Sequence, residues 1–319
     1  MTSVLQVYRA LPIPVGDVFA VAEHPEHRDV LIGRDATGAP AVVVQHSTRE
    51  DGVPVVLRNA MLIPRARVAI TRGQITEEID AAVYRCRAPS TVLREYFVVS
   101  VAGIVASALR AGTFDAATVL RQLAELFHRL SQPATRSLQG FWGELFLIAE
   151  STAPAAMLDA WHVDPYEQFD FARGAERLEM KTCSSLPRTH HFSLGQIRPA
   201  AGVAAFVASL VCRRSTAGVD VHALLDKVRL LAISPEHRAK VELLAADVIS
   251  DDSDIGDVRF DPDEARGSLR FFRAADVPSV SRDLPEGVSN VHFDALLTET
   301  AALVGAPFDS WVLAAAWPR

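Results

Sequence analysis

The chain has 319 residues, of which 49% are hydrophobic and 22% charged, an ordinary globular composition at a length that favours two domains. Its formal net charge of −7 excludes a protein that coats nucleic acid through overall basicity. The 3 cysteines lack C-x-x-C spacing and are odd in number, which excludes a thiolate zinc site and a disulfide framework and predicts small buried residues.

The sequence also predicts a location in the cytoplasm. No basic and apolar leader is visible at its start, and no run of residues approaches the roughly 18 apolar residues that cross a bilayer. We therefore expect no contact with a membrane.

Positive charge gathers in residues 171–214. This segment holds seven cationic and two anionic residues, a net charge of 7 − 2 = +5, so the remainder of the chain carries −7 − 5 = −12. Such an asymmetry is typical of a protein with one surface that faces a polyanion, and a stretch of solvated arginines is the alternative.

Residues 1–112 are predicted to form a β-rich N-terminal domain that serves recognition or assembly. Strand-like segments with alternating or continuous β-branched residues are separated by turns, and "DATGAP" is predicted to be a hairpin loop. These segments are residues 29–46, 53–64, 66–70 and 95–109.

Residues 113–319 are predicted to form an α/β domain. A helix with apolar residues at helical spacing follows Asp115, which is placed to cap it, and the helix in "LQGFWGELFLIAES" is apolar nearly all round and should be buried. Strands are expected at 167–173 and 176–184, then in "HHFSLGQI" and "VAAFVASLVCRR". Amphipathic helices are expected in "VDVHALLDKVRLLA" and "PEHRAKVELLAADV", and one more strand in the tail.

Two carboxylates and one lysine are expected to meet on the predicted hairpin. Side chains alternate on a strand, so Glu179 and Lys181 point the same way, and a turn near Gly174 brings Asp170 close to Glu179. Two carboxylates a few ångströms apart repel, and Mg²⁺ answers this repulsion because it takes hard oxygen ligands from one or two carboxylates. A hairpin with surface ion pairs is the alternative.

Lys181 stands out because nearly every other cation of the chain is arginine. A lysine ammonium is compact and can give up its proton, whereas a guanidinium is planar and effectively always charged. The ammonium is therefore suited to hold, or help deprotonate, a metal-bound water in line with a phosphodiester.

Glu144 is expected to turn toward the core, since it shares a helical face with apolar residues three before, one after and four after it. Burying a lone ionised carboxylate is unfavourable unless it is paired or coordinates a metal. A metal at Asp170 and Glu179, or Lys181 itself, would supply that partner, and escape to solvent at the helix edge is the alternative.

His190 and His191 are neighbours on a predicted strand and should face opposite sides, so both cannot easily bind one metal. We expect one of them near the site in contact with a phosphate and the other packed or solvated. Arg188 and Arg198 flank the pair and are suited to phosphate contacts, which position a substrate without reading its sequence.

Four blocks carry a resemblance to a known family: "GFWGELFLI", "AWHVDPYEQFDF", "LEMKTC" and "HHFSLGQI". In this order, over about residues 138–200, they resemble the PD-(D/E)xK nuclease superfamily, and more narrowly a bacterial branch of PD-(D/E)xK motif proteins often encoded beside restriction or phage-defence genes. The D…ExK core alone is unspecific. Phe169 stands where the motif has proline, but proline is not a ligand.

The resemblance implies a restriction-endonuclease-like α/β/α core around a mixed sheet, with hydrolysis of phosphodiesters that depends on Mg²⁺ or Mn²⁺. Asp170 and Glu179 match the metal ligands and Lys181 matches the catalytic lysine. Glu144 matches the helix acid that assists the site, and Gln196 matches a polar position after the core.

The expected function is that of a Mg²⁺-dependent DNA endonuclease in a restriction or phage-defence system. The alternative is a non-catalytic subunit of the same fold that binds DNA or scaffolds a larger defence or repair complex. DNA is the expected partner. A second copy of the chain, and an ATPase, helicase or methyltransferase from the same operon, are left open. The residues expected to contact substrate are Arg188, His190, His191, Gln196 and Arg198.

Overall fold

The computed structural model of the chain describes residues 3–45, 53–57, 59–88, 90–130, 137–163, 167–248, 258–280, 284–305 and 310–317. It divides into two compact units, which we call unit 1 (Met1–Pro133 with Ile233–Asp252) and unit 2 (Ala134–Ala232 with Ser253–Arg319). The chain therefore enters unit 2, returns to complete unit 1, and ends in unit 2.

This division differs from the predicted boundary at residue 112. Helices α3 (Ala116–Leu130) and α8 (Pro235–Ala246), both expected in the second domain, pack with α2 (Thr91–Arg110) in unit 1. The Tyr96 hydroxyl of α2 donates to the Glu242 carbonyl oxygen of α8 at 2.5 Å, and Ser100 Oγ donates to the Glu242 carboxylate at 2.8 Å. Helical periodicity predicts that α3 and α8 form, but not the unit in which each one packs.

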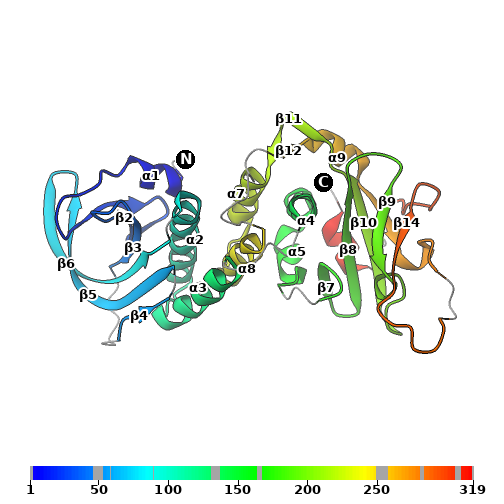
Figure 1. The fold of residues 1–319 in the computed structure, drawn as a ribbon, viewed down its shortest axis with the longest axis horizontal. Helices are drawn as coiled ribbons and strands as arrows, with labels where there is room; N and C mark the ends of the chain where they lie inside the picture. Colours follow the sequence, from blue (N-terminus) through cyan, green and yellow to red (C-terminus); the bar gives the residue numbers. More distant parts are fainter. Residues whose placement is uncertain are drawn as a thin grey trace. The chain divides into compact units, whose positions relative to one another are not determined.

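Unit 1 is built on a sheet that closes on itself (Figure 1). Its strands lie in the order β1-β2-β3-β6-β5-β4, and β1 also pairs with β5 in parallel. The elements are α1 (Val4–Ala10), β1 (Phe19–His24), β2 (His27–Arg34), β3 (Pro40–Val44), β4 (Val55–Val56), β5 (Ala60–Arg72) and β6 (Ile75–Cys86). One face of β1, β2, β3, β5 and β6 fills the interior with apolar side chains, among them Phe19, Leu31, Val43, Ile70 and Val83.

The predicted hairpin loop "DATGAP" is confirmed between β2 and β3. The Asp35 carboxylate accepts hydrogen bonds from the backbone N–H groups of Thr37 (2.9 Å) and Ala39 (3.0 Å). Gly38 adopts φ +76°, a conformation that favours glycine. The side chain of Asp35 thus closes a turn that the sequence could predict from its composition.

The expected strand at 95–109 is wrong, because this segment forms most of helix α2. Ser90 caps the helix by accepting a hydrogen bond from the Leu93 N–H at 3.2 Å. Its residues are buried nearly all round, against β2, β3 and β6 among other elements. A segment that is apolar on every side has no period to distinguish a helix from a buried strand.

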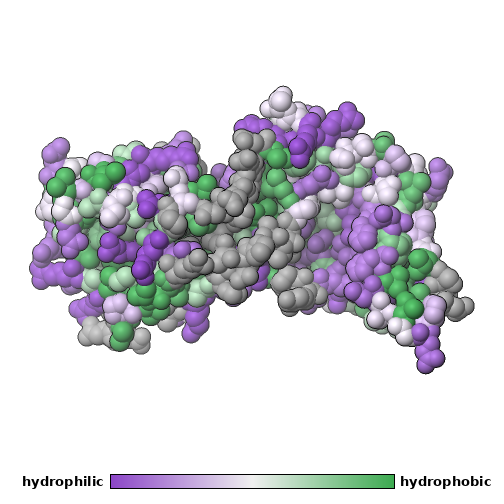
Figure 2. All heavy atoms as spheres, in the orientation of Figure 1, coloured by the Kyte–Doolittle hydropathy of each residue, from purple (hydrophilic) through white to green (hydrophobic). Residues whose placement is uncertain are grey.

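Helix α2 is also long and apolar enough to cross a membrane by length and composition, which the sequence analysis did not anticipate. Most of the helix is buried within unit 1, and a core helix meets the same criterion. On the face shown in Figure 2, hydrophobic residues lie among hydrophilic ones. The length of α2 is accordingly weak evidence for a membrane.

Unit 2 is a mixed α/β fold, which confirms the predicted fold class. Its central sheet has the order β13-β10-β8-β7, with β8 and β10 parallel and the outer pairs antiparallel. Two-stranded pairs join β11 to β12 and β9 to β14. The strands are β7 (Phe171–Arg173), β8 (Glu176–Cys183), β9 (Thr189–Ser193), β10 (Ala204–Val211), β11 (Arg214–Asp220), β12 (Arg259–Phe260), β13 (Arg270–Arg273) and β14 (His292–Leu296).

The helices of unit 2 include those expected in "LQGFWGELFLIAES" and "VDVHALLDKVRLLA". They are α4 (Leu138–Glu150), α5 (Pro154–Ala160), α6 (Leu194–Ile197), α7 (Val221–Leu231), α9 (Pro262–Ser268), the 3-10 helix η1 (Ala274–Asp276) and α10 (Trp311–Ala316). Of the segment expected to be a strand in "HHFSLGQI", only the first half is β9; the rest is α6. The serine at 193 begins α6 by accepting a hydrogen bond from the Gln196 N–H.

The two faces of the central sheet are covered differently. Helix α4 lies against the face that carries Met180 and Thr182, and a Cβ placed on Gly143 would sit 2.5 Å from Thr182 Cγ2. The opposite face packs on β9, β14, α6 and η1, whose apolar side chains form a cluster around Phe192. Because side chains alternate along β8, Glu179 and Lys181 face this second cluster.

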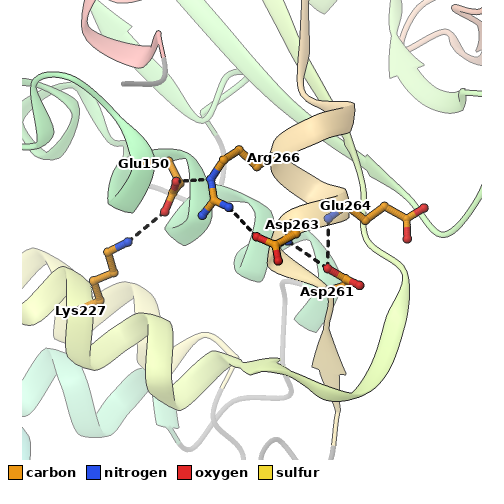
Figure 3. Close-up of polar contacts among 6 residues, drawn as sticks. All are labelled: Glu150, Lys227, Asp261, Asp263, Glu264 and Arg266. Atoms are coloured by element: carbon orange, nitrogen blue, oxygen red, sulfur yellow. Dashed lines mark hydrogen bonds and ion pairs between the residues drawn. The ribbon is translucent and has the colours of Figure 1, made fainter.

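An ion-pair junction joins three helices of unit 2 (Figure 3). Glu150, the last residue of α4, accepts hydrogen bonds from Lys227 Nζ of α7 at 2.9 Å and from Arg266 Nε of α9 at 2.8 Å. Arg266 also bonds to Asp263, and the Asp261 carboxylate caps α9. The two cations hold the pKa of Glu150 below its ordinary value, Arg266 more strongly than Lys227.

Candidate active site

The predicted hairpin places Asp170 beside Glu179. Strands β7 and β8 pair with Phe171 opposite Leu178, so the next position along β7, Asp170, lies opposite Glu179. The Met180 N–H donates to Asp170 Oδ2 at 2.8 Å. This side-chain hydrogen bond takes the place of the next backbone hydrogen bond between β7 and β8 and holds the carboxylate at the edge of the sheet. Local pairing alone therefore brings the first two predicted acids together.

Glu179 and Lys181 are in contact on β8, with the glutamate buried and the lysine partly exposed. Lys181 Nζ lies 2.7 Å from Glu179 Oε1, and the side chains are 18% and 8% exposed, respectively. The ammonium also lies over the Phe192 ring of β9, 5.1 Å from its centroid. A cation over an aromatic face is attracted by the ring quadrupole, so two contacts hold the lysine in one place.

The charges around Glu179 are not balanced. Burial raises the pKa of Glu179, the negative charge of Asp170 acts in the same direction and Lys181 opposes both, so that the pKa is raised to about 8. Glu144 adds a smaller contribution in the same upward direction. Two neighbouring carboxylates repel each other when both are ionised, and a second cation would relieve this repulsion.

Glu144 is buried, as its helical position predicted, and one of its partners is the indole of Trp161. Its Oε2 accepts a hydrogen bond from Trp161 Nε1 at 2.6 Å, and the residue is 6% exposed. The alternative of a solvated carboxylate is therefore wrong. The Trp161 ring stacks between Phe141 and Phe171, at centroid distances of 6.0 and 6.4 Å. Sequence reasoning missed this partner, although Trp161 stands in one of the four blocks.

The residues present fit a hard divalent cation. Asp170 and Glu179 offer carboxylate oxygens, and Mg²⁺ commonly takes one or two carboxylates and keeps several waters. Within the described part of the chain, no group of three or more His, Cys, Asp or Glu side chains is arranged to hold a metal. A site with two carboxylates agrees with that finding, and it disfavours the all-protein cage typical of calcium or zinc.

The two histidines face opposite sides of β9, as predicted. His190 is 3% exposed, and its Nε2 lies 2.8 Å from Ser209 Oγ. His191 is exposed, with Nδ1 3.0 Å from Asp294 Oδ1 and its ring stacked on that of His292. His190 is thus next to the candidate site but enclosed, whereas His191 is accessible but lies on the outer side of the strand.

Arg188 differs most from its predicted position. It is 9% exposed, and its Nη1 donates to the Ser209 carbonyl oxygen (3.0 Å) and to Ser209 Oγ (2.8 Å) while Nη2 donates to the Ser268 carbonyl oxygen. The guanidinium is held inside the unit, which corrects the expectation that it meets a phosphate. Charge composition alone could not show that this segment runs through the interior.

Arg198 and Gln196 also make internal contacts. Arg198 donates to Ser279 Oγ at 3.1 Å and to the Val280 carbonyl oxygen. Gln196 completes the capping box of α6, and its Nε2 donates to the Gln168 carbonyl oxygen at 3.0 Å, two residues before Asp170. Gln196 therefore ties α6 to the segment that leads into the candidate site and lies outside the carboxylate group itself.

A mixed sheet that carries an Asp, a Glu-x-Lys strand and a glutamate on the covering helix is typical of the restriction-endonuclease-like α/β fold. A family model described as "Putative PD-(D/E)XK family member, (DUF4420)" matches residues 6–298, and the chain belongs to this family. Proteins of the PD-(D/E)XK superfamily are usually nucleases. No curated protein and no solved structure matches the chain.

Proposed function

We propose that the chain is a divalent-metal-dependent endonuclease that hydrolyses phosphodiester bonds of DNA at Asp170, Glu179 and Lys181. The observation that carries the proposal is the contact of Lys181 with the buried Glu179 at 2.7 Å, with Asp170 held at the same sheet edge. Membership of a family related to nucleases supports the substrate class.

In this proposal the oxygens of Asp170 and Glu179 would hold Mg²⁺ or Mn²⁺, which supplies Lewis-acid stabilisation and a more acidic water when bound. The Met180 N–H fixes the Asp170 carboxylate, so that ligand does not have to be ordered when a cation arrives. Lys181 brings a compact positive charge close to the ligand oxygens, where it can orient a water or stabilise charge that develops on the phosphate.

Glu144 and Trp161 support the site from the α4 side. Their hydrogen bond joins α4 to the segment that bridges to β7 at Phe171, so they fix the edge strand that precedes Glu179. We further propose, from the sequence resemblance, that the reaction belongs to a bacterial restriction or phage-defence system.

Cleavage of supercoiled plasmid DNA in Mg²⁺ and in Mn²⁺ tests the proposal. Lys181→Met should lower the rate by at least about 100-fold, as expected for loss of a charge that acts in the transition state. Lys227→Met is the matched control: it removes another lysine of unit 2 that pairs with Glu150 on α4, and it should retain most of the activity. Parallel assays with single-stranded DNA and RNA define the substrate class.

Two results would overturn this function. If Lys181→Met cleaves DNA as fast as the wild-type chain in the same metal, Lys181 has no role in the reaction. If the wild-type chain binds DNA but cleaves no nucleic acid in either metal, the non-catalytic DNA-binding subunit becomes the better account.

A further inference from the structure

Three buried polar side chains form a hydrogen-bonded chain beside Lys181. Arg188 Nη1 donates to Ser209 Oγ at 2.8 Å, and Ser209 Oγ lies 2.8 Å from His190 Nε2. All three residues are buried, with Ser209 fully so. They come from two strands and a lead-in segment: Ser209 from β10, His190 from β9, and Arg188 from just before β9.

The donors and acceptors of this chain are consistent with one protonation state. Because arginine can only donate, the Ser209 hydroxyl accepts from Arg188, and its own hydrogen is available to donate to His190 Nε2. His190 also makes a hydrogen bond to the backbone of Thr182. A neutral imidazole with its hydrogen on the other ring nitrogen satisfies both contacts.

A charged His190 is disfavoured by its surroundings. Burial lowers the pKa of His190 to about 4, and the positive charges of Lys181 and Arg188 act in the same direction. The imidazole therefore stays neutral near neutral pH. It brings no second positive charge next to Lys181, whose ammonium contacts Glu179.

The contacts of His190 converge on the part of β8 that carries Lys181. Thr182 follows Lys181 directly, and Ser209 is the register partner of Lys181 on the parallel strand β10. Two residues further along β9, Phe192 places its ring under the lysine ammonium, and the rings of His190 and Phe192 meet edge to face at 6.3 Å. One histidine thus links β8, β9 and β10 around a single lysine.

We propose that His190 is a positioning residue that fixes the side chain of Lys181 through its bonds to Thr182 and Ser209. A catalytic consequence follows if the proposed nuclease function is correct: loss of His190 should displace the ammonium relative to the carboxylates. A direct contact with DNA does not fit a residue that is 3% exposed and whose Nε2 lies 2.8 Å from Ser209 Oγ.

The composition of the chain allows a test that does not depend on activity. Lysine occurs at positions 181, 227 and 240 only, so selective isotope labelling of the lysine ε-methylene gives three NMR signals. Lys181→Met assigns one of them by its disappearance. In the wild-type chain the Lys181 signal should be shifted upfield by the Phe192 ring, while Lys227 and Lys240 serve as internal references.

The variants are His190→Gln and Ser209→Ala, with His222→Gln as the matched control because His222 is an exposed histidine of α7. Both test variants should move the Lys181 signal at least about halfway toward the position of Lys227, and the control should leave it in place. Ser209→Ala removes only one hydroxyl group, so this variant still tests the proposal if His190→Gln fails to fold.

Activity provides the second readout. Because a displacement of about 1 Å can lower a rate about 100-fold, both variants should reduce kcat by about 10- to 100-fold with little change in KM for DNA. An unchanged Lys181 signal in folded His190→Gln and Ser209→Ala would overturn the role of His190 whether or not the chain cleaves DNA. A moved lysine signal in a chain that never cleaves DNA would instead reject the nuclease function alone.

Discussion

At the scale of single residues, the three acids of the candidate site have three different kinds of partner. Asp170 accepts from the backbone N–H of Met180, Glu179 pairs with an ammonium, and Glu144 accepts from the Trp161 indole. A hydrogen bond to an ionised group contributes about 1.5–3 kcal/mol, against about 0.5–1.5 kcal/mol for one between neutral groups. Trp161 is therefore expected to matter more than its packing alone suggests.

Substitution of two tryptophans tests this expectation. Trp161→Phe keeps an aromatic ring in the stack but leaves the buried Glu144 carboxylate without its indole donor, while Trp142→Phe removes a donor to the neutral Val219 carbonyl oxygen. We expect Trp161→Phe to lower the free energy of unfolding by about 1–2 kcal/mol more than Trp142→Phe. Denaturant titration of both variants measures this difference, and equal losses would show that Trp161 acts by packing only.

The buried His24 of β1 predicts a loss of stability in acid. Burial lowers its pKa to about 4, with Arg110 and Arg238 acting in the same direction and Glu26 opposing them, whereas the unfolded chain takes up the proton near 6.5. A group with a depressed folded-state pKa stabilises the fold above the unfolded value and loses that contribution as pH falls. The loss should reach on the order of 3 kcal/mol between pH 6.5 and 4.

Thermal or denaturant unfolding of unit 1 across this pH range measures the effect. His24→Asn removes the titrating ring and keeps a side-chain acceptor for the Glu26 N–H, which His24 Nδ1 now binds at 3.1 Å. The variant should be less stable at neutral pH and should show a flatter dependence on pH. If its stability falls with acid as steeply as that of the wild-type chain, His24 is not the group responsible.

At the scale of elements, the close contact of α4 with β8 depends on a glycine. Gly143→Ala would place its Cβ 2.5 Å from Thr182 Cγ2, so either the Thr182 side chain or the helix must shift. Overpacking of this kind typically lowers stability by about 1–3 kcal/mol. Because Thr182 follows Lys181, the same shift should also disturb the candidate site.

A second substitution makes this prediction specific. Thr182→Ser removes the clashing methyl group but keeps the hydroxyl that accepts from Gln139 Nε2 at 3.2 Å. Gly143→Ala combined with Thr182→Ser should recover most of the stability lost in Gly143→Ala, as measured in a double-mutant cycle. If the losses of stability in the two single variants are additive, the effect of Gly143→Ala arises from the helix backbone and not from the contact with β8.

The elements that sequence reasoning could predict are those specified by local pattern. Strand alternation and a tight turn were enough to place Asp170, Glu179 and Lys181 together. The pattern could not show which of His190 and His191 faces inward, because that depends on the strands that cover β9. It also gave the wrong structure for α2, because burial on every side removes the period that marks a helix.

At the scale of the whole molecule, the chain forms two units, and each unit is made of two separate segments of the sequence. The family model spans residues 6–298 and so includes both units, which makes the barrel of unit 1 part of the family. Helix α8 follows strands of unit 2 in the sequence but belongs to unit 1, where its Glu242 binds Tyr96 and Ser100. The sequence predicted this helix in the second domain, because packing between residues far apart in the chain leaves no local sequence pattern.

The proposed function depends on one cation that Asp170 and Glu179 share. Burial and the charge of Asp170 raise the pKa of Glu179 against the opposing effect of Lys181, so near pH 7 part of the molecules should carry a proton at Glu179 in place of its ion pair with Lys181, and a bound cation should displace that proton. Binding should therefore release protons, which calorimetry detects as a heat that changes with the ionisation enthalpy of the buffer.

Calorimetric titration with Mn²⁺ and Mg²⁺ at pH 7 in two buffers is the most direct test. The wild-type chain should bind an ion with release of a proton, and Asp170→Asn and Glu179→Gln should each abolish binding. Asp263→Asn, which changes an acid of α9 with an 89% exposed side chain, should bind normally. Binding that persists in both site variants, or no binding by the wild-type chain, would contradict the account.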